Sequence, residues 1–250
     1  MELQDKISAW IRNYAESAGM TTLVVGISGG IDSAVVSALC ASTGLNTIAV
    51  TMPIRQRPEL HDLSMQQGVW LTQNFDNVRH EIIDVTPVFD AFESQMNQYN
   101  NLLGMANSRS RLRMVTLYQI AQSTQGLVVG TGNKVEDFGV GFYTKYGDGG
   151  VDISPIGDLY KSQVWRLGRE LGILQDIIDA APTDGLWDDG RTDEDQLSGL
   201  TYSDLELAMR QDNNELPIAN TAEHDRVIVY RRIRARSLHK MNPIPVYQNI

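Results

Sequence analysis

The sequence has one cysteine and no long apolar run. Cys40 cannot form an intrachain disulfide, and its place in the segment AVVSALCAS predicts a small buried side chain. The apolar runs fall far short of the roughly 18 to 20 residues that a membrane-spanning helix needs. The first ten residues, MELQDKISAW, lack the basic start and apolar core of a secretory signal. These absences predict a cytoplasmic protein with no membrane partner.

Basic side chains are also in the minority. The sequence has 21 Lys and Arg against 31 Asp and Glu, for a net charge of −10. Broad binding to a nucleic-acid backbone rewards clustered basic residues, so this balance predicts no nucleic-acid partner. Local clusters around Arg109, Arg111 and Arg113, and from Arg231 to Lys240, could still serve a small anionic ligand. The basic segment HDRVIVYRRIRARSLHKM leaves a nucleic-acid patch open as the weaker alternative.

The 250 residues, 42% of them hydrophobic, suit one globular domain over 1–250. Short β-branched apolar segments alternate with helical stretches, a pattern typical of parallel strands covered by helices. We therefore expect a doubly wound α/β fold, with a mostly parallel five-stranded sheet, helices on both faces and a single domain. The located strands are 21–27, 46–52, 79–85 and 126–131. The predicted helices are 3–18, 32–43, 58–74, 86–97, 104–124, 159–171, 203–212 and 221–238.

The acidic segment PTDGLWDDGRTDEDQLSG follows the predicted helix 159–171 and is too long for a routine connection. Loops of that length usually close over a site or are disordered. We expect residues 183–198 to form a mobile lid that becomes ordered when a nucleotide binds.

The most informative stretch is GISGGIDS, residues 26–33, where the first strand should pass into a helix. In parallel sheets this turn is a favoured phosphate site, because glycines allow close approach and the helix start offers free N–H groups. Ser28 and Ser33 add hydroxyl donors, and Asp32 is a candidate ligand for Mg²⁺. The stretch satisfies neither G-x-x-x-x-G-K-[ST] nor G-x-G-x-x-G. A capped turn without chemistry is the alternative.

The string SGGIDS resembles the pyrophosphate loop of the N-type ATP pyrophosphatases, which cleave ATP between its α and β phosphates and adenylate a substrate. Residues 107–172 are similar to the NAD synthetase family, most specifically in FYTKYGDGGVD, with GT-x-N-K-x-E before it and L-x-K-x-Q after it. PTDGLW, DED followed by LTY, and a late HK pair occur in that family's order. The resemblance covers nearly the whole chain.

This resemblance implies adenylation of the nicotinate carboxylate of deamido-NAD by ATP with Mg²⁺, followed by displacement of AMP by ammonia. It also implies a homodimer. A chain of 250 residues leaves no room for an amino-terminal glutaminase domain, so it resembles the ammonia-dependent form.

The resemblance also assigns residues. The ATP-binding positions are Gly26, Ile27, Ser28, Gly29, Gly30, Ile31, Asp32, Ser33, Thr131, Lys161 and Thr183. The deamido-NAD positions are Arg111, Lys145, Asp152, His239 and Lys240. The metal ligands are Asp32 and Glu136, and the catalytic candidates are Asp148, Asp152 and Lys161.

The residues themselves support several of these assignments. Glu136 follows the strand 126–131 at the same sheet edge as Asp32, so the two acids can share a cation. Asp158 is a plausible cap for the helix that carries Lys161. Arg111 lies one turn before the apolar stripe formed by Met114, Leu117, Tyr118 and Ala121, which suits a pocket-facing cation. Asp148 and Asp152 are candidates for handling ammonia or holding substrate, since a carboxylate attracts ammonium and accepts its proton.

Each assignment has a simpler reading: a solvated acid for Glu136, a surface lysine for Lys161, a basic helix end for Arg111, and an Asp-Gly turn for Asp148. Two further functions also stay open. One is that of another adenylating enzyme of the same superfamily, and the second is that of a nucleotide-binding sensor without turnover.

Overall fold

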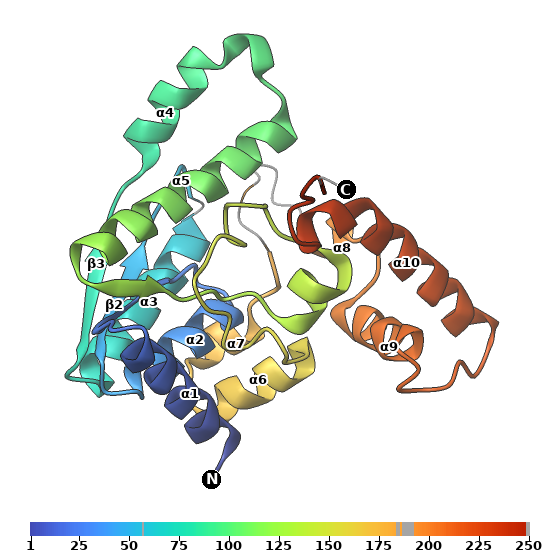
Figure 1. The fold of residues 1–250 in the computed structure, drawn as a ribbon, viewed down its shortest axis with the longest axis horizontal. Coiled ribbons are helices and arrows are strands. Elements are labelled where there is room, and N and C mark those ends of the chain that lie inside the picture. The colour runs from blue at the N-terminus through green and yellow to red at the C-terminus, as the bar shows by residue number, and fades with distance from the viewer. Residues whose placement is uncertain (57, 184–185, 187–192, 249–250) are drawn as a thin grey trace.

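Four parallel strands form the central sheet of the protein, in the order β3-β2-β1-β4 (Figure 1). The structure is a computed structural model that describes residues 1–56, 58–183, 186 and 193–248. The strands are β1 (Thr22–Gly26), β2 (Asn46–Thr51), β3 (Val78–Ile82) and β4 (Gly126–Val128).

The helices cover both faces of the sheet, as the alternation of elements predicts (Figure 1). Their bounds are α1 (Leu3–Ser17), α2 (Ile31–Ala41), α3 (Pro58–Asn74), α4 (Thr86–Gln95), η1 (Asn97–Tyr99), α5 (Leu102–Ser123), η2 (Lys134–Val140), α6 (Lys161–Glu170), α7 (Gln175–Asp179), α8 (Asp193–Gln196), α9 (Tyr202–Asp212) and α10 (Thr221–Met241).

The strand β1 supplies side chains to a separate core on each face. Leu23 and Val25 pack with α1, α2, α3, α6 and α7, whereas Val24 points the other way and packs with α4 and α5. Successive side chains of a strand alternate between faces, so a strand buried on both sides reads as a continuous apolar run. This explains TLVV in the sequence, and the predicted doubly wound α/β fold is confirmed. Cys40 is fully buried in the first core, as predicted.

A third apolar cluster lies beside the sheet, where α9 and α10 pack on the π-helix η2 (Figure 1). Its centre includes Val135, Leu205 and Tyr230, all buried. The cluster fixes η2 next to the carboxyl ends of the strands. No helix in the described ranges combines the length and the apolar character needed to cross a membrane.

The predicted number of five strands is wrong for the described residues, which contain four. A fifth segment reaches β4 only through an isolated parallel bridge between Val129 and Ile153. The backbone N–H of Val128 binds Asp152 Oδ2 at 2.8 Å, so a side chain takes the place of a ladder carbonyl. Pro155 follows two residues after the bridge and has no N–H to continue a ladder.

The predicted cap of α6 is also wrong. Asp158 is exposed and pairs with Lys134 at 3.0 Å. The helix begins after Tyr160, whose backbone N–H binds Gln163 Oε1 at 2.8 Å. A glutamine three residues into a helix can reach back to the residue before it, which makes the Asp158 cap unnecessary.

Candidate active site

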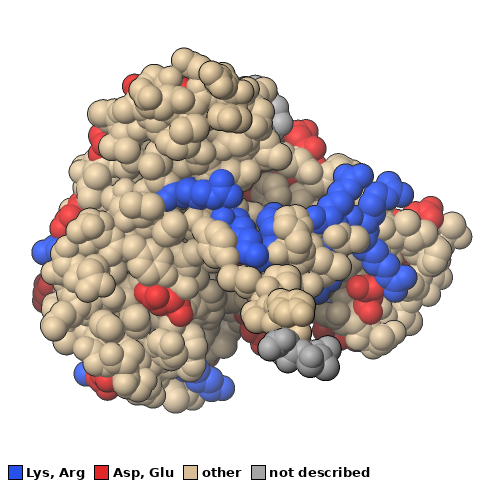
Figure 2. Space-filling view, turned by 45° about the horizontal axis from the view of Figure 1, so that its top comes forward, with Lys and Arg blue, Asp and Glu red and all other residues tan. Residues whose placement is uncertain are grey.

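A cavity of about 840 Å³ opens at the carboxyl ends of β1, β2 and β4. Its wall includes every residue from Gly26 to Ser33, together with 51–53 and 129–132 from the neighbouring strand ends. Figure 2 shows Lys and Arg side chains gathered around a hollow on one face of the molecule. This position beyond the strand ends is where open α/β sheets usually bind ligands.

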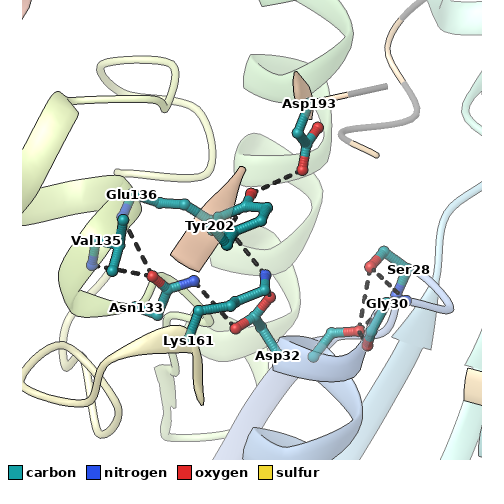
Figure 3. A network of polar contacts seen from close by, with 10 residues as sticks. Ser28, Gly30, Asp32, Asn133, Val135, Glu136, Lys161, Asp193 and Tyr202 are labelled. Atoms are coloured by element: carbon teal, nitrogen blue, oxygen red, sulfur yellow. Dashed lines mark hydrogen bonds and ion pairs between the residues drawn. The ribbon is translucent and has the colours of Figure 1, made fainter. Parts of the chain in front are cut away.

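Hydrogen bonds between its own residues fix the conformation of the GISGGIDS turn. Ser33 Oγ donates to Gly30 O at 2.9 Å and accepts from the backbone N–H of Ser28 at 3.1 Å, and the two serine hydroxyls lie 3.1 Å apart (Figure 3). Gly29 has a φ of 90°, a conformation that glycine adopts without steric cost. The turn leads directly into α2, whose first N–H groups have no carbonyl acceptor within the helix. This geometry suits an anion such as a phosphate chain.

Two carboxylates and one lysine meet beside this turn. Lys161 Nζ lies 2.5 Å from Asp32 Oδ2 and 2.9 Å from Glu136 Oε1, and the lysine side chain is only 3% exposed (Figure 3). The three residues come from the starts of α2, η2 and α6. Asp32 and Glu136 therefore converge on the Lys161 ammonium group. Their shared role as metal ligands stays a prediction.

Asn133 holds the two acids in place and is fully buried. Its Nδ2 donates to Asp32 Oδ1 at 3.1 Å, while its Oδ1 accepts from the backbone N–H groups of Val135 and Glu136 (Figure 3). The side chain thus caps η2 and orients Asp32 at the same time.

Tyr202 bridges Glu136 and Asp193. Its hydroxyl lies 2.6 Å from Glu136 Oε1 and 2.8 Å from Asp193 Oδ2 (Figure 3). Asp193 begins α8 and lies within the predicted lid. Residues 184–185 and 187–192 of that lid lie outside the described residues. The contact links Glu136 to the carboxyl-terminal side of this segment.

The acids that share Lys161 titrate differently. Burial raises the pKa of Asp32 above its usual value, although Lys161 opposes this. Burial also acts to raise the pKa of Glu136, but Lys161 and the Tyr202 hydroxyl together hold it below its usual value. Burial disfavours charge on Lys161, yet Asp32 and Glu136 raise its pKa. The ammonium group is therefore charged throughout the neutral range.

A second polar cluster surrounds Asp148 in the turn YGDGG. Asp148 Oδ1 accepts from Ser110 Oγ at 2.6 Å and from the Thr144 N–H at 3.0 Å, and the Asp148 N–H donates back to Ser110 Oγ at 2.9 Å. The side chain remains open to the cavity, although protein surrounds it on its other sides. This burial raises its pKa above the usual value, against the effect of the Ser110 hydrogen bond.

The side of the cavity next to α5 and α10 is basic. Lys145 Nζ donates to His239 O at 3.2 Å, and Arg111 Nε donates to Lys145 O at 3.2 Å. Lys240 Nζ donates to the carbonyls of Gly141 and Tyr143. The basic residues that border the cavity are Arg111, Arg113, Lys145, Lys161, Arg236 and Lys240. Cations at this position suit phosphate groups.

Residues 3–243 match the family model described as NAD synthase. The chain belongs to the NAD synthase family. The NH(3)-dependent NAD(+) synthetase of Alkaliphilus metalliredigens is 38% identical over 250 aligned residues, with 96% of each chain covered. The solved structure of NMN synthetase from Francisella tularensis is 32% identical, with a TM-score of 0.87, and covers 99% of this chain and 98% of that chain. The NH3-dependent NAD synthetase from Campylobacter jejuni, at 24% identity and a TM-score of 0.81, shares the fold over 99% of this chain and 100% of that chain.

With one exception, the site residues that the resemblance to this family assigned lie on the cavity wall, including Thr131 and Thr183. The exception is Asp152, which is exposed and outside the lining. Asp152 Oδ1 accepts from the Tyr118 hydroxyl at 3.1 Å, while Oδ2 binds the Val128 N–H. Its predicted role toward substrate stays a prediction.

The apolar stripe on α5 contacts the core at one end and lines the cavity at the other. Ala121 is buried in the core as predicted, whereas Met114 and Leu117 are half-buried and line the cavity. Arg113 also reaches the cavity, where its Nε donates to Met52 O at 2.9 Å. Arg109 instead packs over the Phe89 ring, 4.9 Å from its centroid.

Four residues of the site carried no role in the sequence analysis: Asn133, Asp137, Tyr143 and Tyr202. Three of them lie in family motifs, within GT-x-N-K-x-E, FYTKYGDGGVD and LTY, so the motifs themselves were the available signal. Asp137 directly follows Glu136 and carries the same charge. In the π-helix η2 both successive acids reach the cavity. One-turn π-helices are rare and often occur at functional sites.

The donor set fits a magnesium ion that is bound together with a nucleotide. Among the described residues no three His, Cys, Asp or Glu side chains form a metal site on their own. A nucleotide-bound Mg²⁺ usually takes one or two carboxylates and completes its shell with phosphate oxygens and water. Asp32 and Glu136 already hold one cation, the Lys161 ammonium, next to the phosphate-type turn. These two carboxylates are the residues that would hold the ion.

Proposed function

We propose that the protein adenylates the nicotinate carboxylate of deamido-NAD with ATP and then amidates it with ammonia, giving NAD, AMP and pyrophosphate. The observation that carries this proposal is one cavity that joins the GISGGIDS turn, the acids around Lys161 and the Asp148 turn. The names of the similar NH(3)-dependent NAD(+) synthetases support the same activity.

The first step needs help with negative charge. A nicotinate oxygen attacks the α-phosphorus, and the bond to the bridging oxygen breaks so that pyrophosphate leaves with the electron pair. We propose that the backbone N–H groups at the start of α2 and the hydroxyls of Ser28 and Ser33 bind the phosphates, and that Lys161 neutralises charge on the departing group. Asp32 and Glu136 would hold Mg²⁺, which would supply further neutralisation when bound. Thr131 and Thr183, which also line the cavity, would contact ATP.

The second step needs a neutral amine. Ammonia is mostly protonated at neutral pH, so we propose that Asp148 accepts a proton from ammonium. The freed lone pair attacks the carbonyl carbon of the adenylate, and the bond from that carbon to the AMP oxygen breaks with its electron pair going to AMP. The nitrogen then loses a second proton to water, which leaves the amide. Arg111, Lys145, His239 and Lys240 would bind the nicotinate nucleotide, and Asp152 would support the site by holding the end of β4.

A specific observation favours a second substrate. The Francisella tularensis structure with a TM-score of 0.87 is named as an NMN synthetase. The same two steps could therefore act on nicotinate mononucleotide, whose reacting carboxylate is the same. Less favoured functions are those of another adenylating enzyme of the superfamily and of a nucleotide-binding sensor without turnover.

The test is an assay of the purified protein with ATP, MgCl₂ and ammonium chloride, with deamido-NAD, nicotinate mononucleotide or no acceptor in parallel. We expect AMP, pyrophosphate and NAD in equal amounts with deamido-NAD, and little AMP without an acceptor. Faster turnover of the mononucleotide would assign the second substrate. AMP formation that ignores both acceptors would indicate a different adenylating enzyme, and ATP binding without AMP would indicate a sensor.

The oligomeric state, the location and the partners of the protein belong to the same proposal. A homodimer, a cytoplasmic location and the absence of nucleic-acid and membrane partners follow from the resemblance and the composition. Sedimentation of the protein over a range of concentrations tests the dimer, and a lid over residues 183–198 is tested by comparing proteolysis with and without Mg-ATP.

A further inference from the structure

Ser110 is a buried serine at the cavity wall that the mechanism above does not use. Its hydroxyl donates to Asp148 Oδ1 at 2.6 Å and accepts from the Asp148 N–H at 2.9 Å. A hydroxyl carries one donor and two acceptor sites, so this single side chain binds both the carboxylate and the backbone of the same acid. A Cβ atom built on Gly147 would come within 2.3 Å of Ser110 Oγ, so the turn closes directly over the hydroxyl.

One face of α5 holds the segment 144–148. Three residues at spacings of i, i+3 and i+4 on this helix hydrogen-bond the segment, namely Asn107, Ser110 and Arg111. Of these three contacts, only that of Ser110 reaches the Asp148 carboxylate. The other two fix the segment on the helix and leave the acid untouched.

The two oxygens of the Asp148 carboxylate have different surroundings. Oδ1 accepts from Ser110 and also from the backbone N–H of Thr144, at 3.0 Å. In the described part of the chain, no hydrogen bond or ion pair reaches Oδ2. The side chain is open to the cavity, so Oδ2 is the oxygen that a ligand can contact.

The ammonium groups of the basic wall have other hydrogen-bond acceptors. The charge of Lys240 acts on Asp148 through space, but its Nζ binds two backbone carbonyls. Lys145 Nζ binds the carbonyl of His239. Neither group is hydrogen-bonded to Oδ2, which therefore stays available to a small cation with N–H donors.

We propose that Ser110 is a positioning residue, which holds Asp148 Oδ1 so that Oδ2 faces the cavity and takes the proton from ammonium. This inference rests on the proposed function. Two donors on one oxygen oppose rotation of the carboxylate, and a hydrogen bond to a carboxylate favours its charged form, which can accept a proton. An N–H bond of ammonium breaks, its electron pair stays on nitrogen, and the new O–H bond forms at Oδ2.

The test compares the wild type with Ser110→Ala, which removes the hydroxyl and leaves Asp148 in place. We expect kcat/KM for ammonium to fall roughly 10- to 100-fold, as for a lost hydrogen bond to a charged group. Hydroxylamine is uncharged at neutral pH and attacks without first losing a proton, so hydroxamate formation should stay within about twofold. The KM values for ATP and the nicotinate nucleotide should also stay within about twofold.

Two matched variants separate positioning of the carboxylate from packing. Ser108→Ala makes the same substitution on α5, where Ser108 Oγ donates to Gly104 O at 2.9 Å, and should leave both reactions unchanged. Thr144→Val removes the hydroxyl that donates to Asn107 at 2.7 Å and keeps the N–H that binds Asp148. Any loss in Thr144→Val should therefore be equal for ammonium and hydroxylamine.

Adenylation is measured separately, as exchange of pyrophosphate into ATP in the presence of the nucleotide acceptor. Normal exchange in Ser110→Ala shows that its fold and first step are intact. If this variant loses exchange, Ser110→Cys fills the position with a weak donor, and the same selective fall with ammonium is expected. Loss of exchange in both variants would assign Ser110 to the fold and overturn the proposal.

Three further results would also overturn the positioning role of Ser110. They are an unchanged kcat/KM for ammonium in Ser110→Ala, an equal loss with hydroxylamine, and the same selective loss in Thr144→Val. A wild-type protein that makes no amide from ammonium would instead overturn the proposed function itself.

Discussion

Lys161 and Asp32, separated by 129 positions in the sequence, form a buried ion pair with Nζ 2.5 Å from Oδ2. Glu136 accepts from the same ammonium group at 2.9 Å. Lys161 thus places one positive charge between the two acids that would hold a metal ion. We expect a divalent cation that binds these same carboxylate oxygens to displace the ammonium group, which would then be free to contact the phosphates.

The first prediction concerns this shared position. Lys161→Met leaves two carboxylates without their cation. The free energy of unfolding should fall by about 3 to 5 kcal/mol, because removing one partner of a buried ion pair leaves an uncompensated charge in the interior. Urea unfolding without metal measures the loss. Millimolar Mg²⁺ or Mn²⁺ without ATP should then stabilise the variant more than the wild type.

The control for Lys161 is Lys134→Met, which removes a pair with the exposed Asp158. Exposed pairs contribute at most about 1 kcal/mol. Equal stabilisation of wild type and Lys161→Met by the metal would contradict competition between the lysine and the ion.

The second prediction concerns Tyr202. Its hydroxyl bridges Glu136 and Asp193, so Tyr202→Phe removes a hydrogen bond to a charged group and should cost about 1.5 to 3 kcal/mol. Glu136 loses a hydrogen bond that holds its carboxylate in place. Adenylation, measured as exchange of pyrophosphate into ATP, should therefore slow as well. Tyr160→Phe is the matched control, because Tyr160 is also buried and its hydroxyl binds Glu215 at 3.0 Å, outside the cavity. A variant of Tyr202 that loses stability but keeps normal exchange would limit Tyr202 to a structural role.

Much of this site could be predicted from the sequence, because its parts lie within short segments. GISGGIDS places its glycines, serines and Asp32 at one turn, and the alternation of strands and helices places that turn at the carboxyl edge of the sheet. Glu136 could be placed at the same edge because it follows the next strand of the sheet. Motif and topology together bring these residues to one cavity.

The remaining features depend on packing between distant segments. Tyr202 reaches Glu136 across 66 positions, and no local pattern encodes that contact. The π-helix that turns both Glu136 and Asp137 toward the cavity has no periodic signature in seven residues. The prediction of a fifth strand was wrong for a related reason. Asp152 binds the backbone of β4 through its side chain, and a strand pattern in the sequence cannot reveal such a contact.

The third prediction concerns the backbone of the phosphate-type turn. Gly29 has a φ of 90°, where a Cβ costs roughly 1 to 2 kcal/mol, so Gly29→Ala should shift the turn and weaken ATP binding by about tenfold or more. Equilibrium binding of a non-hydrolysable ATP analogue measures the effect. Gly172→Ala is the control, because Gly172 also has a positive φ, of 73°, but lies after α6 with no atom within 4 Å of the added Cβ. Equal effects of both variants on ATP binding would show that the turn is not part of the ATP-binding site.

The fourth prediction concerns stability and pH at Asp137. Burial, followed by Asp148, Glu136 and Asp32, raises the pKa of Asp137 well above 3.8 in the folded protein. The folded state therefore binds more protons than the unfolded state between these two pKa values, and its stability falls as the pH rises through that window. Asp137→Asn lacks this penalty. We expect the variant to be more stable than the wild type by about 1 to 3 kcal/mol at pH 7.

The gain from Asp137→Asn should shrink as the pH is lowered through the raised pKa and vanish below 3.8, where the acid becomes neutral in the unfolded state as well. Urea unfolding at several pH values measures it, with Asp76→Asn as the exposed control that should show no such trend. A gain that persists unchanged into acid would mean that the charge of Asp137 is not its source. A loss of stability at pH 7 would mean that the carboxylate has a favourable partner in the free protein.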